Sequence, residues 1–300
     1  MKILLAVDGS ECSQRAVEEI ARTPWPERSI VRVASVAEIR SLTLPTEWEE
    51  IFEGRSIANI AKAVSRFGEI AGARVEITTK TLRGDPKAVL LDEAEHWHAD
   101  LIVVGTHGFN ALTRLWLGSV SRAVVTHAKC SVRVARSLET KPRVGTRILI
   151  AVDGSVGSDA AINAVSGRPW VPGTEVHIVS AIQLPFVPTA EAWALPEGYY
   201  KQLEQESRDQ AKAAIKGALA VLEGTGRKTP LTVTAETIVG HPEEVILGTA
   251  KARGSNLIIL GSHGYRGIER FLLGSVSSAV AFHAHCSVEI VRVPLTGSDQ

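Results

Sequence analysis

The sequence predicts a doubly wound α/β domain with a parallel five-stranded sheet, built twice in one chain. Two observations carry this prediction. Short apolar runs rich in Val and Ile alternate with longer segments of helical periodicity, and the second half of the 300-residue chain repeats the first. Nearly continuous apolar strands joined by helices are typical of a parallel sheet that is covered on both faces and wound with right-handed crossovers.

In the first half, we expect the element order β-α-β-α-β-α-β-α-β. Apolar runs of four to eight residues predict strands at residues 3–7, 30–36, 75–82, 101–105 and 132–135. Helical spacing predicts helices at residues 10–22, 57–71, 86–96 and 119–127. Ser10 and Asp85 stand at expected helix N-caps, and Pro86 suits a first helical turn.

The repeat extends over most of the chain. The stretch "ILLAVDGS" at residues 3–10 returns 145 residues later as "ILIAVDGS". Residues 100–136 align without gaps with residues 256–292, at an offset of 156, and 19 of the 37 positions are identical. Solenoid repeats run at roughly 20 to 50 residues, so this period indicates a duplicated domain. We expect domains at residues 1–137 and 146–295, joined by the polar segment "SLETKPRVGT".

Bulk composition narrows the possible partners and the location. The 33 basic residues balance 33 acidic ones without any Lys/Arg block, so neither a nucleic acid nor a membrane is expected as a partner. Cys12, Cys130 and Cys286 are odd in number and far apart, which argues against a disulfide framework. Because no targeting signal is recognised at the N-terminus, we expect a cytoplasmic location.

A glycine-rich loop, "VVGTHGFNALTRLWLGSVS" at residues 103–121, follows the fourth predicted strand. It places Gly105, Gly108, Gly118 and Ser119 at a spacing that the second half repeats with Gly261, Gly264, Gly274 and Ser275. Glycines let backbone amides approach an anion, and a helix N-terminus at Ser119 favours phosphate. Since ligands bind beyond the carboxyl ends of such strands, each half is predicted to bind a polyphosphate.

Asp8 and Asp153 follow the first strand of each half and precede Gly-Ser. A carboxylate at that strand end can accept hydrogen bonds from ribose hydroxyls or an exocyclic amine. The alternative is that both aspartates serve only as helix caps.

Histidines have both functional and structural interpretations. His107 and His263 lie within the glycine loops, where they would either donate to a phosphate or simply pack. The His-x-His pairs at residues 96–98 and 283–285, the latter beside Cys286, lack a clear fourth ligand. We therefore expect these pairs to be structural, and we predict no metal site formed by the protein.

The G-x2-G-x9-G-S spacing, the "AVDGS" start and the "LGSVS" helix entry resemble the universal stress protein family, and the duplication resembles its tandem form. The resemblance covers nearly the whole chain. It implies a Rossmann-like fold of the adenine nucleotide alpha hydrolase type. It also implies ATP as the ligand, with Mg²⁺ held mainly by phosphate oxygens. Two departures are Cys-Ser in place of the family's frequent Cys-Pro before the last strand, and few basic residues in the loops.

By this resemblance, Asp8 and Asp153 lie near the nucleoside, and backbone groups at Val36 and Ala181 meet the adenine. The remaining nucleotide-binding candidates of the first half are Gly9, Gly105, His107, Gly108, Arg114, Gly118, Ser119, Val120 and Ser121. Those of the second half are Gly154, Gly261, His263, Gly264, Arg270, Gly274, Ser275, Val276 and Ser277.

The expected function is a nucleotide-sensing regulator in a stress response, with little or no turnover. Phosphoryl transfer usually needs a cationic clamp, and the chain has no G-x-x-x-x-G-K-[ST] motif and no lysine in its glycine loop. The alternatives are a slow ATPase or adenylate-using enzyme, and a structural dimer with vestigial loops. The last strands are expected to pair, either in a homodimer or in an intrachain pseudo-dimer. Segments around Trp48 and Trp193 would cover the adenine or pack at a domain interface.

Overall fold

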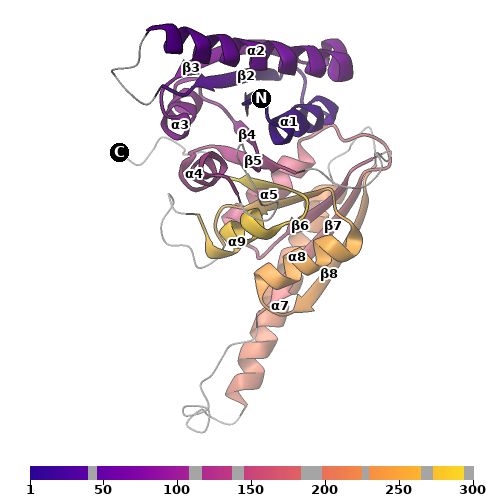
Figure 1. The fold of residues 1–300 in the computed structure, drawn as a ribbon. Helices are drawn as coiled ribbons and strands as arrows, with labels where there is room; N and C mark the ends of the chain where they lie inside the picture. Colours follow the sequence, from indigo (N-terminus) through magenta and orange to yellow (C-terminus); the bar gives the residue numbers. More distant parts are fainter. Residues whose placement is uncertain are drawn as a thin grey trace, which may run out of the picture.

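The computed structural model describes residues 1–39, 46–107, 117–136, 145–183, 198–224, 230–264 and 273–293. These residues form one ten-stranded sheet with helices on both faces, as Figure 1 shows. The strand order is β3-β2-β1-β4-β5-β10-β9-β6-β7-β8. Within the described residues, no helix is both long and apolar enough to cross a membrane.

The first half alternates strands and helices in the predicted order. Its elements are β1 (Lys2–Ala6), α1 (Glu11–Arg22), β2 (Ile30–Ala37), α2 (Thr46–Ala71), the short 3-10 helix η1 (Gly72–Arg74), β3 (Glu76–Arg83), α3 (Pro86–His96), β4 (Leu101–Gly105), α4 (Ser119–His127) and β5 (Ser131–Ala135). The parallel register of β1 with β2 and β4 brings the carboxyl ends of these strands to one edge.

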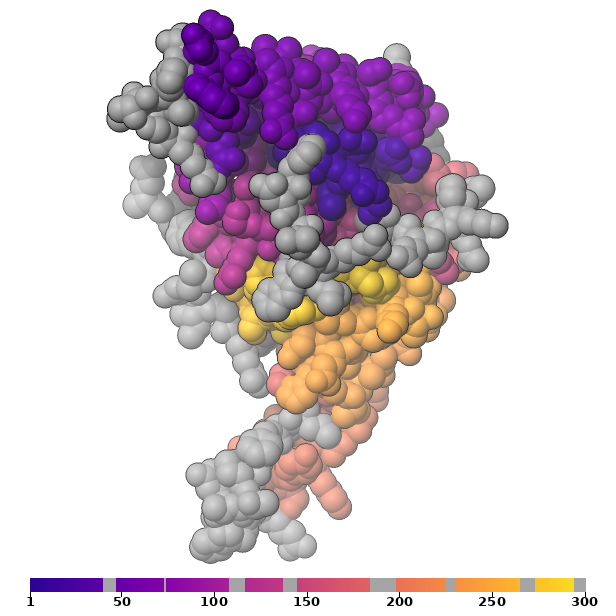
Figure 2. Space-filling view, in the orientation of Figure 1, coloured from indigo at the N-terminus to yellow at the C-terminus, as the bar shows by residue number. Residues whose placement is uncertain are grey.

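The second half repeats this arrangement. Its elements are β6 (Arg147–Ala151), α5 (Val156–Ser166), β7 (Glu175–Ile182), α7 (Tyr199–Glu223), β8 (Thr232–Val239), α8 (Pro242–Arg253), β9 (Leu257–Gly261), α9 (Ser275–His283) and β10 (Ser287–Val291). Figure 2 shows the two halves stacked against each other, the N-terminal half in indigo to magenta and the C-terminal half in pink to yellow.

Most predicted elements are confirmed, but the predicted start of the second helix is wrong. Helical spacing predicts a helix from residue 57, whereas α2 begins at Thr46. Gly54 lowers the helix propensity of this part and interrupts the apolar spacing, while Glu47 and Glu49 favour the first turn through the helix dipole. Trp48 consequently lies on this helix, where it is half exposed, rather than on a covering loop. Trp193 lies outside the described residues.

The two halves join through their last strands. β10 pairs antiparallel with β5, with Val288 opposite Val134 and Glu289 opposite Arg133. The intrachain pseudo-dimer, one of the two predicted arrangements, is therefore present, and the two expected five-stranded sheets are continuous. Because the junction is antiparallel while the strands within each half are parallel, the carboxyl ends of the two halves face opposite edges of the sheet.

Apolar residues form three cores around this sheet. One core lies under α1 and α2 and another under α5 and α7, so each of these belongs to a single half. The third core lies under α3, α4, α8 and α9 and runs across the junction, where Val134 and Val288 are buried in it. The halves consequently share a hydrophobic core on one face of the sheet.

Phe67 on α2 tests this packing, because its side chain is fully buried against β2. We expect Phe67→Ala to lower the free energy of unfolding by about 3–5 kcal/mol, through lost apolar burial and the cavity that remains. Urea denaturation measures this change. Ile57→Ala is the matched control on the same helix, since Ile57 is 58% exposed, and should change stability by no more than about 0.5 kcal/mol. Equal losses for the two variants would contradict the packing.

Candidate functional site

A cleft of about 720 Å³ opens at the carboxyl edge of the first half. Its apolar wall comes from strand residues that include Ala6, Ala34 and Val104, together with Leu90 of α3. Among the sequence-predicted residues, the cleft is lined by Asp8, Val36, Gly105, His107, Gly118, Ser119, Val120 and Ser121. The structure thus brings together residues from the ends of β1, β2 and β4 and from the start of α4.

The turn after β1 places Asp8 at this cleft. Asp8 Oδ1 accepts a hydrogen bond from the Ser10 amide at 3.0 Å. The Ser10 hydroxyl accepts from the Ser13 amide at 3.2 Å and donates to the His107 carbonyl at 3.4 Å. Ser10 is therefore the N-cap of α1, and Asp8 instead closes the turn that precedes it. The interpretation of Asp8 as only a helix cap is wrong.

The loop between β4 and α4 is anchored at both ends. The Gly118 amide donates to the Thr106 carbonyl at 2.7 Å, and the Ser121 hydroxyl donates to the Gly105 carbonyl at 2.6 Å. Gly118 is the N-cap of α4 and provides no side-chain cap. The first amides of α4 therefore lie beside the cleft without a capping side chain, where the positive end of the helix dipole favours an anion.

Helix α2 contributes residues that the sequence-based prediction missed. Phe52, Arg55, Ser56 and Asn59 all line the cleft. Asn59 also explains why a glycine follows Asp8, since a Cβ on Gly9 would lie 2.3 Å from Asn59 Oδ1 and Gly9 has a positive φ of 81°. The helix was expected to begin only at residue 57, so most of these side chains lay in an expected loop.

Ser56 and Lys87 add polar character to the cleft. The Ser56 side chain is buried, and its hydroxyl has no hydrogen-bond partner among the described residues. A buried hydroxyl without a partner is unusual in a folded protein. Lys87, in the first turn of α3, brings a cation to the lining, while Glu38 and Asp85 bring carboxylates.

The second half repeats the anchors of the first. Asp153 Oδ1 accepts from the Ser155 amide at 3.0 Å, and the Ser277 hydroxyl donates to the Gly261 carbonyl at 2.7 Å. Ser155 is the N-cap of α5, so Asp153 is not a helix cap either. Gly274 caps α9 without a side chain, as Gly118 caps α4. The backbone scaffold is the same in both halves.

The side chains around the second scaffold differ. Ala214 of α7 lies over Gly154 where Asn59 lies over Gly9, and three residues earlier the buried Ala211 replaces Ser56. A Cβ on Gly264 would lie only 2.5 Å from Asp153 Oδ2, which shows that the glycine loop passes close to this carboxylate. At these two positions, the long helix of the second half thus offers no polar side chain to the scaffold.

The remaining candidates have different outcomes. Gly108, Arg114 and Arg270 lie outside the described residues. Ala181 lies near the carboxyl end of β7 and is partly buried, whereas Ser275, Val276 and Ser277 form the first turn of α9. His263 corresponds to His107 and accepts through its carbonyl from Ser155 at 3.4 Å.

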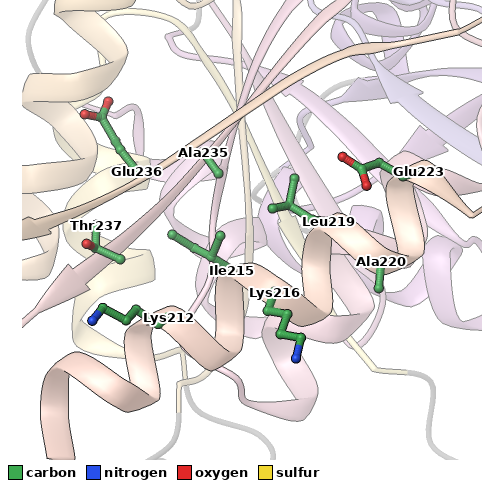
Figure 3. A pocket seen from close by; sticks show the side chains of 9 residues that line it. All are labelled: Lys212, Ile215, Lys216, Leu219, Ala220, Glu223, Ala235, Glu236 and Thr237. Atoms are coloured by element: carbon green, nitrogen blue, oxygen red, sulfur yellow. The ribbon is translucent and has the colours of Figure 1, made fainter.

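A second hollow, of about 560 Å³, lies outside the predicted sites between α7 and the edge strand β8. Figure 3 shows Ile215 and Leu219 on the strand-facing side of α7, opposite Ala235. Lys212, Lys216 and Glu236 also line this hollow. None of the sequence-predicted site residues is part of its lining.

The Cys130 and Cys286 thiols are unsuited to nucleophilic chemistry. Burial raises the pKa of the Cys130 thiol to about 11 and that of the Cys286 thiol to about 12. Both remain protonated at neutral pH, as expected of small apolar side chains. Among the described residues, no group of three or more His, Cys, Asp or Glu side chains is arranged to hold a metal ion.

Four histidines whose pKa is lowered in the folded state make the stability of the fold sensitive to acid. Burial is the main cause that lowers the pKa of His107, His177, His263 and His285 from the ordinary value of 6.5. The folded protein therefore binds protons less readily than the unfolded chain, so the free energy of unfolding should fall as the pH drops below 6.5.

Thermal unfolding between pH 8 and pH 5 measures this dependence. We expect His107→Gln with His263→Gln to make the melting temperature less sensitive to pH over this range, since two of the four groups are removed. A melting temperature that rises as the pH falls through 6.5 would contradict the assignment.

Comparison with known proteins agrees with the geometry of the two halves. The model of the universal stress protein family matches residues 1–136 and again residues 146–292. A universal stress protein of Mycobacterium tuberculosis strain H37Rv is 29% identical over 251 residues, which cover 82% of this chain and 78% of that protein. Another from the same strain is 26% identical over 318 residues and covers 97% of this chain and 95% of that protein.

A solved structure shows the same overall fold. The crystal structure of a universal stress protein from Archaeoglobus fulgidus DSM 4304 matches with a TM-score of 0.69 at 20% identity, and covers 97% of this chain and 98% of that one. The duplicated sequence, the paired α/β halves and the two family matches lead to one conclusion: the chain belongs to the universal stress protein family and carries two domains of that family in tandem.

Proposed function

We propose that the cleft of the first half binds an adenine nucleotide, ATP in particular, and that its occupancy is sensed as a regulatory signal in a stress response. The single observation that supports this most is the convergence of three features in one cleft. These are the apolar wall of strand residues, the Asp8 carboxylate and the uncapped amino end of α4.

Each part of a nucleotide has a matching part of the cleft. The volume of about 720 Å³ falls within the range of roughly 300–1,000 Å³ that is usual for small-molecule sites. In the proposed complex, the adenine lies against the apolar wall near Val36 and the ribose hydroxyls donate to Asp8. The phosphates lie at the amides of Ser119, Val120 and Ser121, where the helix dipole stabilises negative charge.

Magnesium fits this proposal as a companion of the phosphates. Mg²⁺ prefers oxygen ligands and usually keeps several waters when phosphates supply part of its shell. Asp8, Glu38 and Asp85 provide carboxylate oxygens at the cleft, although they form no complete metal-binding cluster among the described residues. The ion would neutralise phosphate charge, and these carboxylates would orient its waters.

The first half is proposed as the principal site. Its α2 presents Arg55, Ser56 and Asn59 to the cleft, whereas the second half has the apolar Ala211 and Ala214 at the latter two positions. A polar ligand gains hydrogen bonds from the first set that the second set does not offer.

Binding without efficient turnover is proposed because the chain has no phosphate-binding G-x-x-x-x-G-K-[ST] motif. Lys87 and Arg55 bring positive charge to the described lining of the cleft, which favours the binding of phosphates. We therefore propose a sensor in which ATP occupancy of the cleft is the signal that partners read.

Calorimetric titration of the full chain with ATP and Mg²⁺ tests the proposal, after nucleotide carried through purification has been removed and identified by mass spectrometry. We expect close to one ATP per chain. Asp8→Asn keeps the oxygen that accepts from the Ser10 amide but removes the charge, so it should weaken binding by about tenfold, or about 1.4 kcal/mol. Asp153→Asn makes the same change in the second half and should leave the affinity nearly unchanged.

Three results would argue against the proposal. Absence of heat at millimolar ATP would exclude a nucleotide site, and equal effects of the two variants would remove the preference for the first half. Phosphate release that persists through repurification and disappears in Asp8→Asn would favour the slow ATPase instead.

A further inference from the structure

The junction between the halves has an outer part that obeys the pseudo-twofold symmetry of the duplication. At the offset of 156, Arg136 corresponds to Arg292 and Ser131 to Ser287. The Arg136 amide donates to the Ser287 hydroxyl at 2.9 Å, and the Arg292 amide donates to the Ser131 hydroxyl at 3.2 Å. The serines that replace the family's frequent proline thus act across the junction.

The guanidinium groups follow the same symmetry. Arg136 Nη2 donates to the Ala281 carbonyl of α9, and Arg292 Nη2 donates to the equivalent Val125 carbonyl of α4 at 3.0 Å. These outer contacts would form equally well between two first halves or two second halves, since both partners carry the same residues. They cannot distinguish like from unlike halves.

The centre of the junction is chemically asymmetric. Arg133 and Glu289 are equivalent positions of the duplication, and they lie directly opposite each other in the antiparallel register. A residue that faces its own equivalent lies on the pseudo-twofold axis. Arg133 Nε and Nη2 donate to Glu289 Oε2 at 2.8 and 2.6 Å, and both side chains are only 1% exposed.

Neighbouring charges reinforce this asymmetry. Arg168 also donates to Glu289, and its equivalent at the offset of 145 is the uncharged Thr23. Glu19 Oε1 lies 3.4 Å from Arg133 Nη1, and the residue equivalent to Glu19 in the second half is Ala164. Burial alone would raise the pKa of Glu289, but Arg168 and Arg133 outweigh it and lower the pKa to about 2.

Pairing like halves would place like charges on the axis. Two first halves would oppose Arg133 with a second Arg133, and two second halves would oppose Glu289 with a second Glu289. Like charges that are buried in direct contact repel strongly, because little water screens them. Glu19 or Arg168 would partly offset the repulsion, but neither replaces the two hydrogen bonds that Arg133 donates to Glu289 across the axis.

We propose that the Arg133–Glu289 pair makes this junction selective for unlike halves. The surface formed by β5 and its neighbouring charges accepts the second half of the chain and rejects a second copy of itself. The chain therefore closes on its own second domain, and this surface is not available for pairing like halves of two chains.

Co-expression of two full-length variants with different affinity tags tests the selectivity. Arg133→Glu and Glu289→Arg each place like charges on the axis of their own chain. In a domain-swapped dimer, the first half of each chain pairs with the second half of the other chain. One of its two junctions then regains Arg133 opposite Glu289. The other junction contains both substitutions, so a carboxylate again faces a guanidinium, with the two sides exchanged. The swap is favourable only if the two positions are coupled across the axis. We expect a species of twice the chain mass that is recovered through both tags.

Arg136→Glu with Arg292→Glu is the matched control. These residues belong to the same junction but contact serines and helix carbonyls rather than each other. A domain-swapped dimer of these two variants would again combine one intact junction with one junction that carries both substitutions. Because Arg136 and Arg292 do not contact each other, this dimer should be no more stable than the two separate chains. We expect at least about tenfold less two-tag species than from the central pair.

The result that overturns the proposal is equal recovery of two-tag species from the central and control pairs, or none from either. If the charge-reversed chains do not fold, urea unfolding of full chains carrying Arg133→Met, Glu289→Gln or both replaces the test. Each single substitution changes the unfolding equilibrium constant by some factor. If the two residues are coupled, the factor for the double variant should be at least about tenfold smaller than the product of the two single factors. Single effects that simply multiply would overturn it.

Discussion

The antiparallel pairing of β5 with β10 is the interaction on which the rest of the architecture depends. It joins two parallel five-stranded sheets into one and buries Val134 and Val288 in a core that both halves share. On the opposite face, the same two strands carry Arg133 and Glu289. Because side chains alternate along a strand, a single short pairing supplies an apolar contact on one face and an ionic contact on the other. It also turns the two carboxyl edges, and thus the two repeated backbone scaffolds, in opposite directions.

Both scaffolds rest on the same backbone device. A turn after the first strand is closed by an aspartate and followed by a serine N-cap, and a helix begins at a glycine that cannot cap it with a side chain. Duplication has kept this device in both halves while the long second helix has diverged. Asn59 and Ser56 in one half correspond to Ala214 and Ala211 in the other. In the proposed complex, the backbone holds the phosphate anion, and the neighbouring helix decides which other groups the ligand meets.

The predictions that succeeded were those governed by local chemistry. Buried parallel strands are apolar along their whole length, so their runs of Val and Ile were recognisable, and Ser10 and Asp85 marked helix starts through capping. Because the start of α2 was predicted wrongly, several residues that line the cleft were missed. Phe52, Arg55 and Ser56 lie in a stretch where Gly54 and several polar residues hide the helical spacing, so apolar periodicity did not reveal that α2 begins at Thr46.

The sequence by itself determined the duplicated α/β fold, the order of its elements and the positions of the repeated glycines within each half, because these follow from periodicity, capping and self-similarity along the chain. Tertiary structure alone decided which residues meet across large separations. It placed α2 over the first cleft, set Arg133 against Glu289 at a distance of 156 residues in sequence, and gave Ser131 and Ser287 their partners in the opposite half. The physical reason is that strand register and helix packing are set by burial of the whole sheet, which no local pattern encodes.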